Sequence, residues 1–371
     1  MLIGVPREIK NREYRVGLVP ASVRELTAHG HQVLIESGAG AGIGAADAEY
    51  VQAGAQLAQR AADIWQRAQL VVKVKEPQAV ERAQLRSGQT LLAYLHLAAD
   101  VEQARELMAS GAACIAYETV TDAQGRLPLL MPMSEVAGRM AIQVGAACLE
   151  KVRGGRGVLL AGVPGVAPGK VVILGAGVAG SNAARIAAGI GADVTVLDRN
   201  PEALRALSLT LGSAVKTLAA TRDAIEAQVC SADLVIGAVL VAGAAAPRLI
   251  TRAMVARMQP GAVIVDIAID QGGCCETSRP TTHDEPSYVV SGVVHYCVTN
   301  MPGAVPRTAA FALDNATLPH ILRLAGAGVA AALRADPYLR AGLTLHGGRV
   351  THRAVADALG LAYTDPLAAL G

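Results

Sequence analysis

Short apolar runs alternate with amphipathic stretches along the first third of the chain. Runs of strand length and composition occur at residues 2–5, 31–37, 70–76, 90–98 and 114–120. Between them, residues 22–30 and 101–110 space their apolar side chains as a helix does. Alternating strands and helices are typical of parallel sheets. The pattern therefore predicts an α/β domain in this part of the chain.

A long helix and a second α/β region follow. The apolar residues of 134–152 recur at helical spacing, and Ser134 is a suitable N-cap. Further strands are predicted at 171–174, 194–197, 232–240, 262–270 and 294–302. From Arg307 onward the pattern is helical, with no second glycine-rich motif. We expect an α/β fold with two Rossmann-like domains and parallel sheets, in which residues 1–128 and 307–371 form a discontinuous outer domain and residues 129–306 form the other.

One stretch has the arrangement of a dinucleotide-binding turn. The strand 171–174 runs into Gly175, Gly177 and Gly180, spaced G-x-G-x-x-G, and an Ala-rich helical segment follows. The first glycine permits a tight turn, the second lets the backbone approach a pyrophosphate, and the third lets the helix pack closely on the strand. Free N–H groups at the helix start would bind the phosphates. The alternative is a glycine-rich turn without a ligand, since the chain contains 39 glycines.

The residue that ends the following strand indicates which dinucleotide would bind. Asp198 would accept hydrogen bonds from ribose hydroxyls and would repel a 2′-phosphate, which favours NAD over NADP. Arg199 acts in the opposite direction, because an arginine at this place can accommodate a 2′-phosphate. The motif thus predicts an NAD-binding domain over residues 129–306.

Composition and charge exclude several classes of protein. The 371-residue chain is 52% hydrophobic and 3% aromatic, and its net charge is +2. No basic run indicates nucleic-acid binding, and polar residues, Gly and Pro interrupt every apolar stretch, so we expect no membrane span. The six cysteines lack metal or disulfide spacing, which suits a reducing, cytoplasmic location. Cys274 and Cys275 could form a redox pair or half a metal site, although adjacent cysteines bridge poorly.

Several polar residues lie at or near the ends of apolar runs, where open parallel sheets bind their ligands. Asp270 ends one run and would lie at a site, or it could cap a turn. His96 interrupts another run, where a hydrogen-bonded core histidine is the alternative. Lys73 and Lys75 would share one strand face. Burying their charges costs desolvation free energy unless an acidic side chain or a bound anion pairs with them. Arg15 could bind a carboxylate with two hydrogen bonds, or it could be a solvated loop residue.

The sequence resembles the alanine dehydrogenase family over essentially its whole length. Many separate motifs carry the resemblance in the same order: GVPREIKNREYRVGLVPASV, VKVKEP, AYLHLA, PMSEVAGRMA, GGRGVLLAGVPGV, the glycine turn, DLVIGAVLV and VDIAIDQGGC with SRPTT. The resemblance implies NAD-dependent oxidative deamination of L-alanine to pyruvate and ammonia, and the reverse reaction. It also implies a cytoplasmic hexamer.

The resemblance assigns roles to individual positions. Arg15 and Lys75 would hold the substrate carboxylate and carbonyl oxygen, so that 1–128 with 307–371 would be the substrate (catalytic) domain. His96 and Asp270 would move protons at the reacting carbon, with Tyr94 and Met133 as our suggested pocket lining. The NAD contacts implied are Ser134, Gly175, Gly177, Val178, Ala179, Gly180, Asp198, Val239, Leu240, Ile267, Asp270, Arg279, Val298, Asn300 and Met301.

This chain departs from the family pattern at a few places. Val19 stands where a hydroxyl residue often precedes the proline, and Ala203 and Ala220 replace polar residues on the adenine side. Arg323 and Ala327 occupy positions where some members bind a metal, so we expect no such site.

Two other functions are compatible with the same motifs. The first is the NAD-binding part of a proton-translocating transhydrogenase, which would carry hydride without an amino-acid substrate. The second is a catalytically silent NAD-binding sensor or scaffold. Within the enzyme class, serine and 2-aminobutyrate are alternative substrates.

Overall fold

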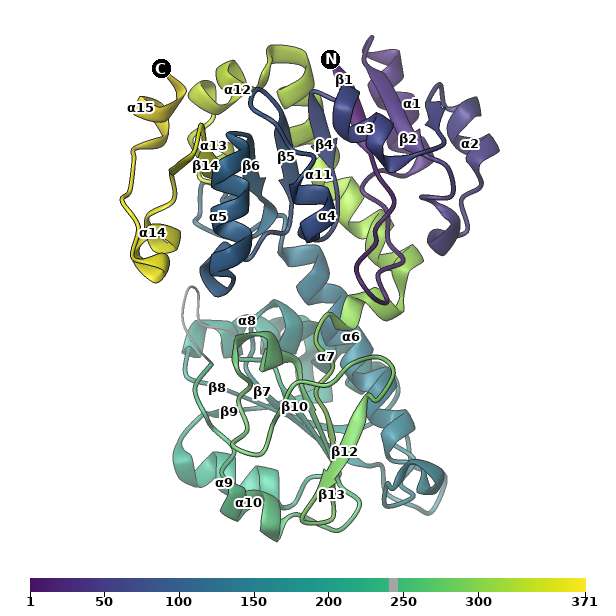
Figure 1. Cartoon of the computed structure of the whole chain (residues 1–371). Coiled ribbons are helices and arrows are strands. Elements are labelled where there is room, and N and C mark those ends of the chain that lie inside the picture. The colour runs from purple at the N-terminus through teal and green to yellow at the C-terminus, as the bar shows by residue number, and fades with distance from the viewer. Residues whose placement is uncertain (240–245) are drawn as a thin grey trace. The chain divides into compact units, whose positions relative to one another are not determined.

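The structure is a computed structural model that describes residues 1–239 and 246–371 (Figure 1). Met1–Met133 and Gly303–Gly371 form one compact unit, and Ser134–Pro302 forms a second. The expected boundaries lie at 128/129 and 306/307. Both ends of the chain contribute to the first unit, which confirms that this domain is discontinuous.

The first unit contains an eight-stranded sheet in the order β15-β14-β6-β5-β4-β1-β2-β3. Its strands are β1 Leu2–Val5, β2 Gln32–Glu36, β3 Gln56–Ala58, β4 Leu70–Val72, β5 Thr90–Ala93, β6 Ala113–Ala116, β14 Leu343–His346 and β15 Arg349–Val350. All neighbours among β1 to β6 pair in parallel, whereas β14 is antiparallel to both β6 and β15. Its helices are α1 Pro20–Ala28, α2 Asp47–Gln52, α3 Ala61–Arg67, α4 Ala79–Arg82, α5 Val101–Ser110, α11 Pro306–Ala327, α12 Val329–Ala335, α13 Pro337–Arg340, α14 Arg353–Leu359 and α15 Pro366–Leu370, with 3₁₀ turns η1 Ala41–Ile43, η2 Leu97–Ala99 and η3 Tyr117–Thr119.

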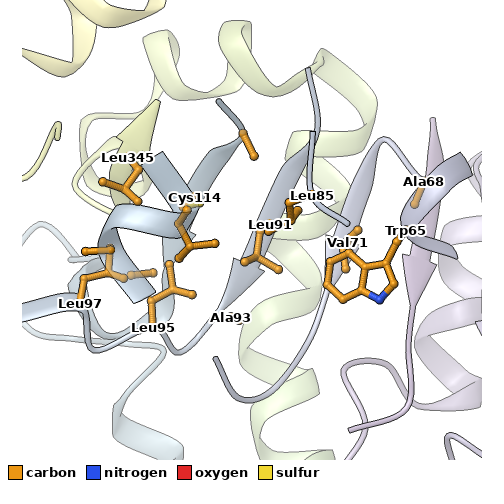
Figure 2. Close-up of a cluster of buried hydrophobic side chains, with 14 of the residues drawn as sticks. Trp65, Ala68, Val71, Leu85, Leu91, Ala93, Leu95, Leu97, Cys114 and Leu345 are labelled. Carbon is orange, nitrogen blue, oxygen red and sulfur yellow. The ribbon is translucent and has the colours of Figure 1, made fainter. Parts of the chain in front are cut away.

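A continuous apolar cluster fixes the register of this sheet. Trp65 of α3, Leu91 of β5, Cys114 of β6 and Leu345 of β14 belong to it and are all inaccessible to solvent (Figure 2). Leu91 and Cys114 are partners in the β5–β6 ladder. A slip of one residue would turn the buried side chains to the opposite face of the sheet. The strand ends, and the loops that follow them, are therefore fixed by core packing.

The second unit contains a seven-stranded sheet in the order β12-β13-β11-β10-β7-β8-β9. Its strands are β7 Lys170–Leu174, β8 Asp193–Asp198, β9 Val215–Ala219, β10 Leu234–Gly237, β11 Val263–Asp266, β12 Ser287–Val290 and β13 Val293–Tyr296. Only β12 runs antiparallel to its neighbour. Its helices are α7 Val178–Gly189, α8 Pro201–Leu211, α9 Arg222–Cys230 and α10 Arg252–Arg257, with 3₁₀ turns η4 Lys151–Arg153, η5 Gly212–Ala214 and η6 Ile267–Gln271. Helix α6 Met131–Cys148 and the 3₁₀ turn η7 Met301–Ala304 cross the boundaries between the units. The predicted α/β class with two mostly parallel sheets is confirmed.

Several predicted elements have other bounds in the structure. The strands predicted at 70–76, 90–98 and 262–270 end at Val72, Ala93 and Asp266. Each apolar run thus continues beyond the paired residues into a loop. Helix α6 begins at Met131, so Ser134 lies inside it and the prediction of Ser134 as N-cap is wrong.

The C-terminal segment contains strands that the sequence pattern did not predict. β14 and β15 form a hairpin around Gly347 and Gly348, whose φ values are 56° and 76°. Two adjacent glycines with positive φ are typical of a tight hairpin turn. The Gly-Gly pair between apolar runs was the signal available in the sequence.

A carboxylate from a distant helix is bonded to the start of α1. Val19 precedes α1 and has no side chain that could cap it. Asp314 of α11 lies at this end of α1 and accepts hydrogen bonds from Val19 N at 3.0 Å and from Ser22 Oγ at 2.5 Å. The first turn of α1 is thus bonded directly to α11.

No single helix in the described part of the chain is long and apolar enough to cross a membrane; α11 and α12 reach that length and composition only as a pair, bent by 116°. All six cysteines are free thiols, five buried and Cys230 partly exposed.

We predict that Asp314→Asn alters how stability depends on pH. Burial raises the pKa of Asp314 from 3.8 to about 6. Because the folded pKa is the higher one, protonation of Asp314 stabilises the fold below pH 3.8, and this contribution is lost as pH rises through about 6. Urea unfolding should show the wild type losing up to about 3 kcal/mol relative to the variant across this window. A difference between the two proteins that is constant with pH would contradict this account.

Candidate functional site

In the first unit, four polar side chains follow four neighbouring parallel strands. Arg15 follows β1, Lys75 follows β4, His96 follows β5, and Glu118 lies in η3 directly after β6. These strands are adjacent in the order β6-β5-β4-β1. Carboxyl ends of parallel strands meet at one edge of a sheet, which is where such sheets bind ligands. The fold therefore brings three sequence-predicted residues, and one that the sequence analysis missed, to one sheet edge.

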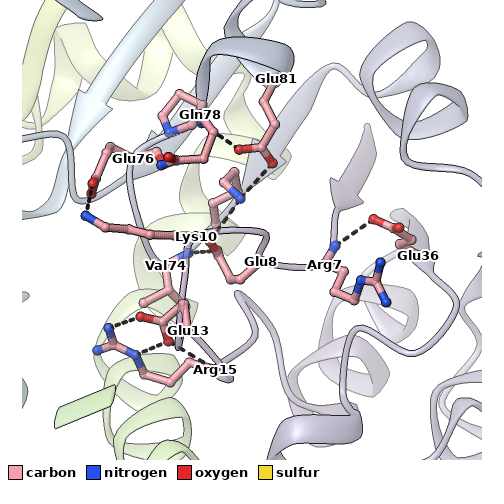
Figure 3. A network of polar contacts seen from close by, with 12 residues as sticks. Arg7, Glu8, Lys10, Glu13, Arg15, Glu36, Val74, Glu76, Gln78 and Glu81 are labelled. Atoms are coloured by element: carbon pink, nitrogen blue, oxygen red, sulfur yellow. Dashed lines mark hydrogen bonds and ion pairs between the residues drawn. The ribbon is translucent and has the colours of Figure 1, made fainter. Parts of the chain in front are cut away.

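Arg15 is buried, with 2% of its surface exposed, and it is paired with Glu13. Its Nε and Nη2 donate to the two carboxylate oxygens of Glu13 at 2.7 and 2.6 Å (Figure 3). Its Nη1 lies 3.1 Å from Sδ of Met133, a weak acceptor. Burial alone would lower the pKa of Arg15, but the hydrogen bonds and charge of Glu13 raise it above its usual value. The guanidinium is thus held charged in one orientation.

The two lysines after β4 do not share a strand face, because the strand ends before either of them. Lys73 is inaccessible to solvent, and its Nζ lies 3.0 Å from Glu8 Oε2 and 2.9 Å from Glu81 Oε1. The acidic partners that we expected for a buried lysine are therefore present. Lys75 lies in a bend and is partly exposed. Of the two lysines, Lys75 is therefore the more exposed residue.

His96 does not belong to the apolar core. Its side chain is 50% exposed and its backbone is left-handed, with φ of 50° and ψ of 38°. Such a conformation is uncommon for a residue other than glycine and must be held by its surroundings. Glu118 holds it, accepting hydrogen bonds from His96 N at 2.6 Å and from Leu95 N at 3.2 Å. The histidine is presented outward by its turn.

Glu118 also faces the imidazole, since its Oε1 lies 4.0 Å from Nδ1 of His96. The ring of Tyr94 is parallel to the imidazole, with centroids 6.0 Å apart, and the Tyr94 hydroxyl donates to Leu129 O at 2.6 Å. The sequence signal for Glu118 was a carboxylate directly after the apolar run 114–117, which is the same kind of signal that Asp270 gave.

In the second unit, the three glycines of the turn after β7 differ in what surrounds them. Gly175 has φ of 104°, and a Cβ there would lie 2.5 Å from Ala238 O. A Cβ on Gly180 would lie 1.8 Å from Gly175 O, so helix α7 packs directly on the turn. Gly177 is exposed, and nothing lies within 4 Å of its Cβ position. The turn therefore leaves an open surface at the start of α7, next to Val178 and Ala179.

Asp198 ends β8 and ties its loop to the glycine turn. Its Oδ2 accepts a hydrogen bond from Ala176 N at 2.6 Å, and its Oδ1 accepts one from Asn200 N at 2.7 Å. The carboxylate remains partly exposed, and Arg199 beside it is exposed. Asp198 thus lies at the carboxyl edge of the sheet, close to the backbone of the open turn.

The other predicted cofactor positions also follow strand ends of this sheet. They are Val239 after β10, Ile267 and Asp270 in η6 after β11, and Val298, Asn300 and Met301 after β13. Asp270 is exposed, and Arg279 packs its guanidinium 4.1 Å from the centre of the Tyr288 ring. Ser134 lies in α6. Leu240 lies outside the described residues.

A buried aspartate shapes the loop that carries Asp270. Asp266 is inaccessible to solvent and accepts hydrogen bonds from Cys274 N at 2.9 Å and from Ser278 Oγ at 2.6 Å. It therefore closes the segment between β11 and Arg279. Asp266 therefore has a structural role, while Asp270 lies at the surface.

Within residues 1–239 and 246–371, no group of three or more His, Cys, Asp or Glu side chains could hold a metal ion. Arg323 of α11 forms an ion pair with Asp336.

We predict opposite effects for two Gly→Ala changes in helix α7. Gly180→Ala should lower the free energy of unfolding by about 2 kcal/mol or more, because its Cβ would overlap Gly175 O. Gly189→Ala is the matched control, since its Cβ would meet nothing within 4 Å. Alanine there should be neutral or stabilise by up to about 1 kcal/mol. Equal effects of the two substitutions on thermal unfolding would contradict the close packing of α7 on the turn.

Comparison with known proteins gives the family. Residues 4–137 match the model "Alanine dehydrogenase/PNT, N-terminal domain", and residues 141–353 match "Alanine dehydrogenase/PNT, C-terminal domain". The chain is 57% identical over 371 residues, the full length of both proteins, to the alanine dehydrogenase of Halomonas elongata.

Two solved structures resemble the fold. An L-alanine dehydrogenase with 53% identity has a TM-score of 0.94 and covers 97% of this chain and 99% of its own. A transhydrogenase from Sinorhizobium meliloti, 26% identical, has a TM-score of 0.82 and covers 95% of this chain and 100% of its own. Since both family models match and together span most of its length, the chain belongs to the alanine dehydrogenase/PNT family.

Proposed function

We propose that this protein is an NAD-dependent L-alanine dehydrogenase, which converts L-alanine, water and NAD⁺ reversibly into pyruvate, ammonium, NADH and a proton. The family membership and the full-length similarity to an alanine dehydrogenase support the activity. The observation that carries the site is the sheet edge of the first unit, where Arg15, Lys75 and His96 follow neighbouring parallel strands. The conversion of an amino acid into an oxo acid requires one cation that binds the carboxylate and a second that binds the carbonyl oxygen. It also requires a group that carries protons.

Arg15 and Lys75 are assigned to substrate binding. Two bonds to Glu13 fix the guanidinium of Arg15, and Nη1 faces the thioether of Met133. A substrate carboxylate is a far stronger acceptor than a thioether, so we assign it to Nη1. The ammonium of Lys75 would lie on the carbonyl oxygen and stabilise negative charge there when pyruvate is aminated.

His96 and Asp270 are assigned to the chemical step. Loss of hydride from the α-carbon of alanine leaves an iminium cation, to which water then adds. The carboxylate of Asp270 would stabilise this cation, and His96 would move the protons of water and the leaving amine. Glu118, with Oε1 at 4.0 Å from Nδ1, places a negative charge beside the ring when it carries a second proton.

The glycine turn fits a dinucleotide, and we propose NAD. The family uses a nicotinamide cofactor, which accepts the hydride when bound. The open surface at Gly177 would admit a pyrophosphate to the start of α7. At the end of β8, Asp198 would bind the ribose hydroxyls and repel a 2′-phosphate. Val178, Ala179, Val239, Ile267, Arg279, Val298, Asn300, Met301, Ser134 and Leu240 are proposed as further contacts.

We predict that the purified protein forms NADH from L-alanine and NAD⁺, with a lower kcat/KM for NADP⁺. His96→Ala and Asp270→Asn should each reduce kcat by about 10²-fold or more, because each removes a group that acts on the reacting atoms. NADH binding, measured by fluorescence titration, should be nearly unchanged in His96→Ala. His29→Ala is the matched control, since His29 is 58% exposed on the surface of the first unit.

Three outcomes would contradict this proposal. Turnover of serine or 2-aminobutyrate above that of L-alanine would change the substrate. NADH binding without turnover of any amino acid would favour a hydride carrier like the transhydrogenase that the fold resembles, or a silent NAD-binding protein. Full activity of His96→Ala would remove the assigned proton carrier.

The family resemblance also supports a homohexamer and a cytoplasmic location, which we propose for this chain. Six free thiols suit a reducing compartment. A monomer mass by sedimentation, or recovery outside the cytoplasm on fractionation, would refute the respective proposal.

A further inference from the structure

Lys73 forms a buried charge network with two glutamates from different segments. Its Nζ lies 3.0 Å from Oε2 of Glu8 and 2.9 Å from Oε1 of Glu81. All three side chains are almost completely buried, with side-chain exposures of 0%, 2% and 4%. We call these three residues the Lys73 network. Glu8 belongs to the loop after β1, and Glu81 belongs to α4.

Stability alone does not account for the Lys73 network. Removing charges from water costs several kcal/mol per ion, and apolar residues of similar volume often serve a fold equally well or better. Burial raises the pKa of Glu8, and the charge of Lys73 opposes this effect. The charges of Glu8 and Glu81 raise the pKa of Lys73 against the effect of its burial. The network therefore needs a reason besides packing.

The second oxygen of each carboxylate binds the backbone on either side of Lys75. Oε1 of Glu8 accepts a hydrogen bond from Val74 N at 2.7 Å, and Oε2 of Glu81 accepts one from Gln78 N at 2.7 Å (Figure 3). Lys75 lies between these two backbone groups. Residues 73–78 are neither helix nor strand, because β4 ends at Val72 and α4 begins at Ala79. The bend that carries Lys75 is therefore held by side chains on both sides.

The Lys73 network also connects the segments that carry the two proposed substrate-binding residues. Glu8 lies in the same loop as Glu13 and Arg15, between β1 and α1. Through Glu8, the position of this loop is fixed against the bend of Lys75. A second link between the same segments is the ion pair of Lys10 with Glu76 (Figure 3). Their spacing is thus set by direct bonds as well as by the sheet.

We propose that the Lys73 network is a positioning device, which holds the Arg15 loop and the Lys75 bend at the spacing that an oxo-acid substrate requires. This inference rests on the proposed role of Lys75 in substrate binding. Glu8 and Glu81 act through the backbone N–H groups of Val74 and Gln78, and Lys73 holds the two carboxylates together. Loss of the bonds to Val74 N and Gln78 N would remove two restraints on the bend without removing Lys75 itself.

Two triple variants test this proposal. The amide variant is Glu8→Gln, Lys73→Met, Glu81→Gln, and the leucine variant is Glu8→Leu, Lys73→Met, Glu81→Leu. Both remove every charge of the Lys73 network, but only the amide variant keeps an oxygen that can accept from Val74 N and Gln78 N. With NADH and ammonium saturating, the KM for pyruvate should rise about tenfold or more in the leucine variant and remain within about threefold in the amide variant. NADH affinity should be unchanged in both.

Leu345→Ala is the control for lost stability. Leu345 is a buried core residue of β14 outside the network, so its truncation should lower Tm and leave the KM for pyruvate unchanged. The proposal is overturned if the leucine variant keeps the wild-type KM, or if both triple variants raise KM equally. Should the leucine variant not fold, the same comparison between Glu81→Leu and Glu81→Gln decides the question.

Lys75→Met separates this inference from the proposed function. If Lys75→Met keeps the wild-type KM for pyruvate, the substrate-binding role of Lys75 is wrong. If Lys75→Met raises KM and the leucine variant does not, only the positioning role of the network is wrong.

Discussion

Parallel pairing of neighbouring strands is the constraint on which the candidate site depends. In the first unit, β1, β4, β5 and β6 run in the same direction, so the segments after them all begin at one edge of the sheet. Residues separated by more than 100 positions, such as Arg15 and Glu118, are gathered in this way. The second unit applies the same constraint to the glycine turn, Asp198 and Asp270.

Carboxylates that accept backbone N–H groups then shape each loop at these edges. Glu118 holds the left-handed turn of His96, and Asp198 holds the glycine turn through Ala176 N. Asp266 closes the loop after Asp270 through Cys274 N. Irregular segments have no ladder of their own to satisfy the backbone, so charged acceptors serve instead, and such bonds are stronger than neutral ones. The functional groups thereby gain fixed positions without regular secondary structure.

Sequence patterns predicted the elements better than their ends. The α/β class and the helix over 101–110 were predicted from periodicity, because burial imposes that pattern on the residues themselves. The discontinuous domain was expected from the helical pattern after Arg307 together with the organisation that is common in two-domain dehydrogenases. The strand ends at Val72, Ala93 and Asp266 were not, because apolar residues continue past them into buried loops. Where a strand ends depends on its pairing with neighbouring strands, and the local sequence pattern holds no information about those neighbours.

In the candidate site, too, one part could be predicted from the sequence and another could not. Chemistry-bearing residues such as Arg15 and Asp270 could be named from their residue types and from the family resemblance. Their partners could not, because Glu13, Glu118 and the Lys73 network depend on contacts between segments that are distant in sequence or on the course of a loop. A buried lysine predicted an acidic partner in general, and only the structure identifies Glu8 and Glu81.

The most direct test of this account is a crystal structure of the protein with NADH and oxamate, an unreactive analogue of pyruvate. The account predicts the oxamate carboxylate on Nη1 of Arg15, its carbonyl oxygen on Nζ of Lys75, and His96 within hydrogen-bond distance of the ligand. Oxamate bound away from the carboxyl ends of β1, β4 and β5 would contradict it.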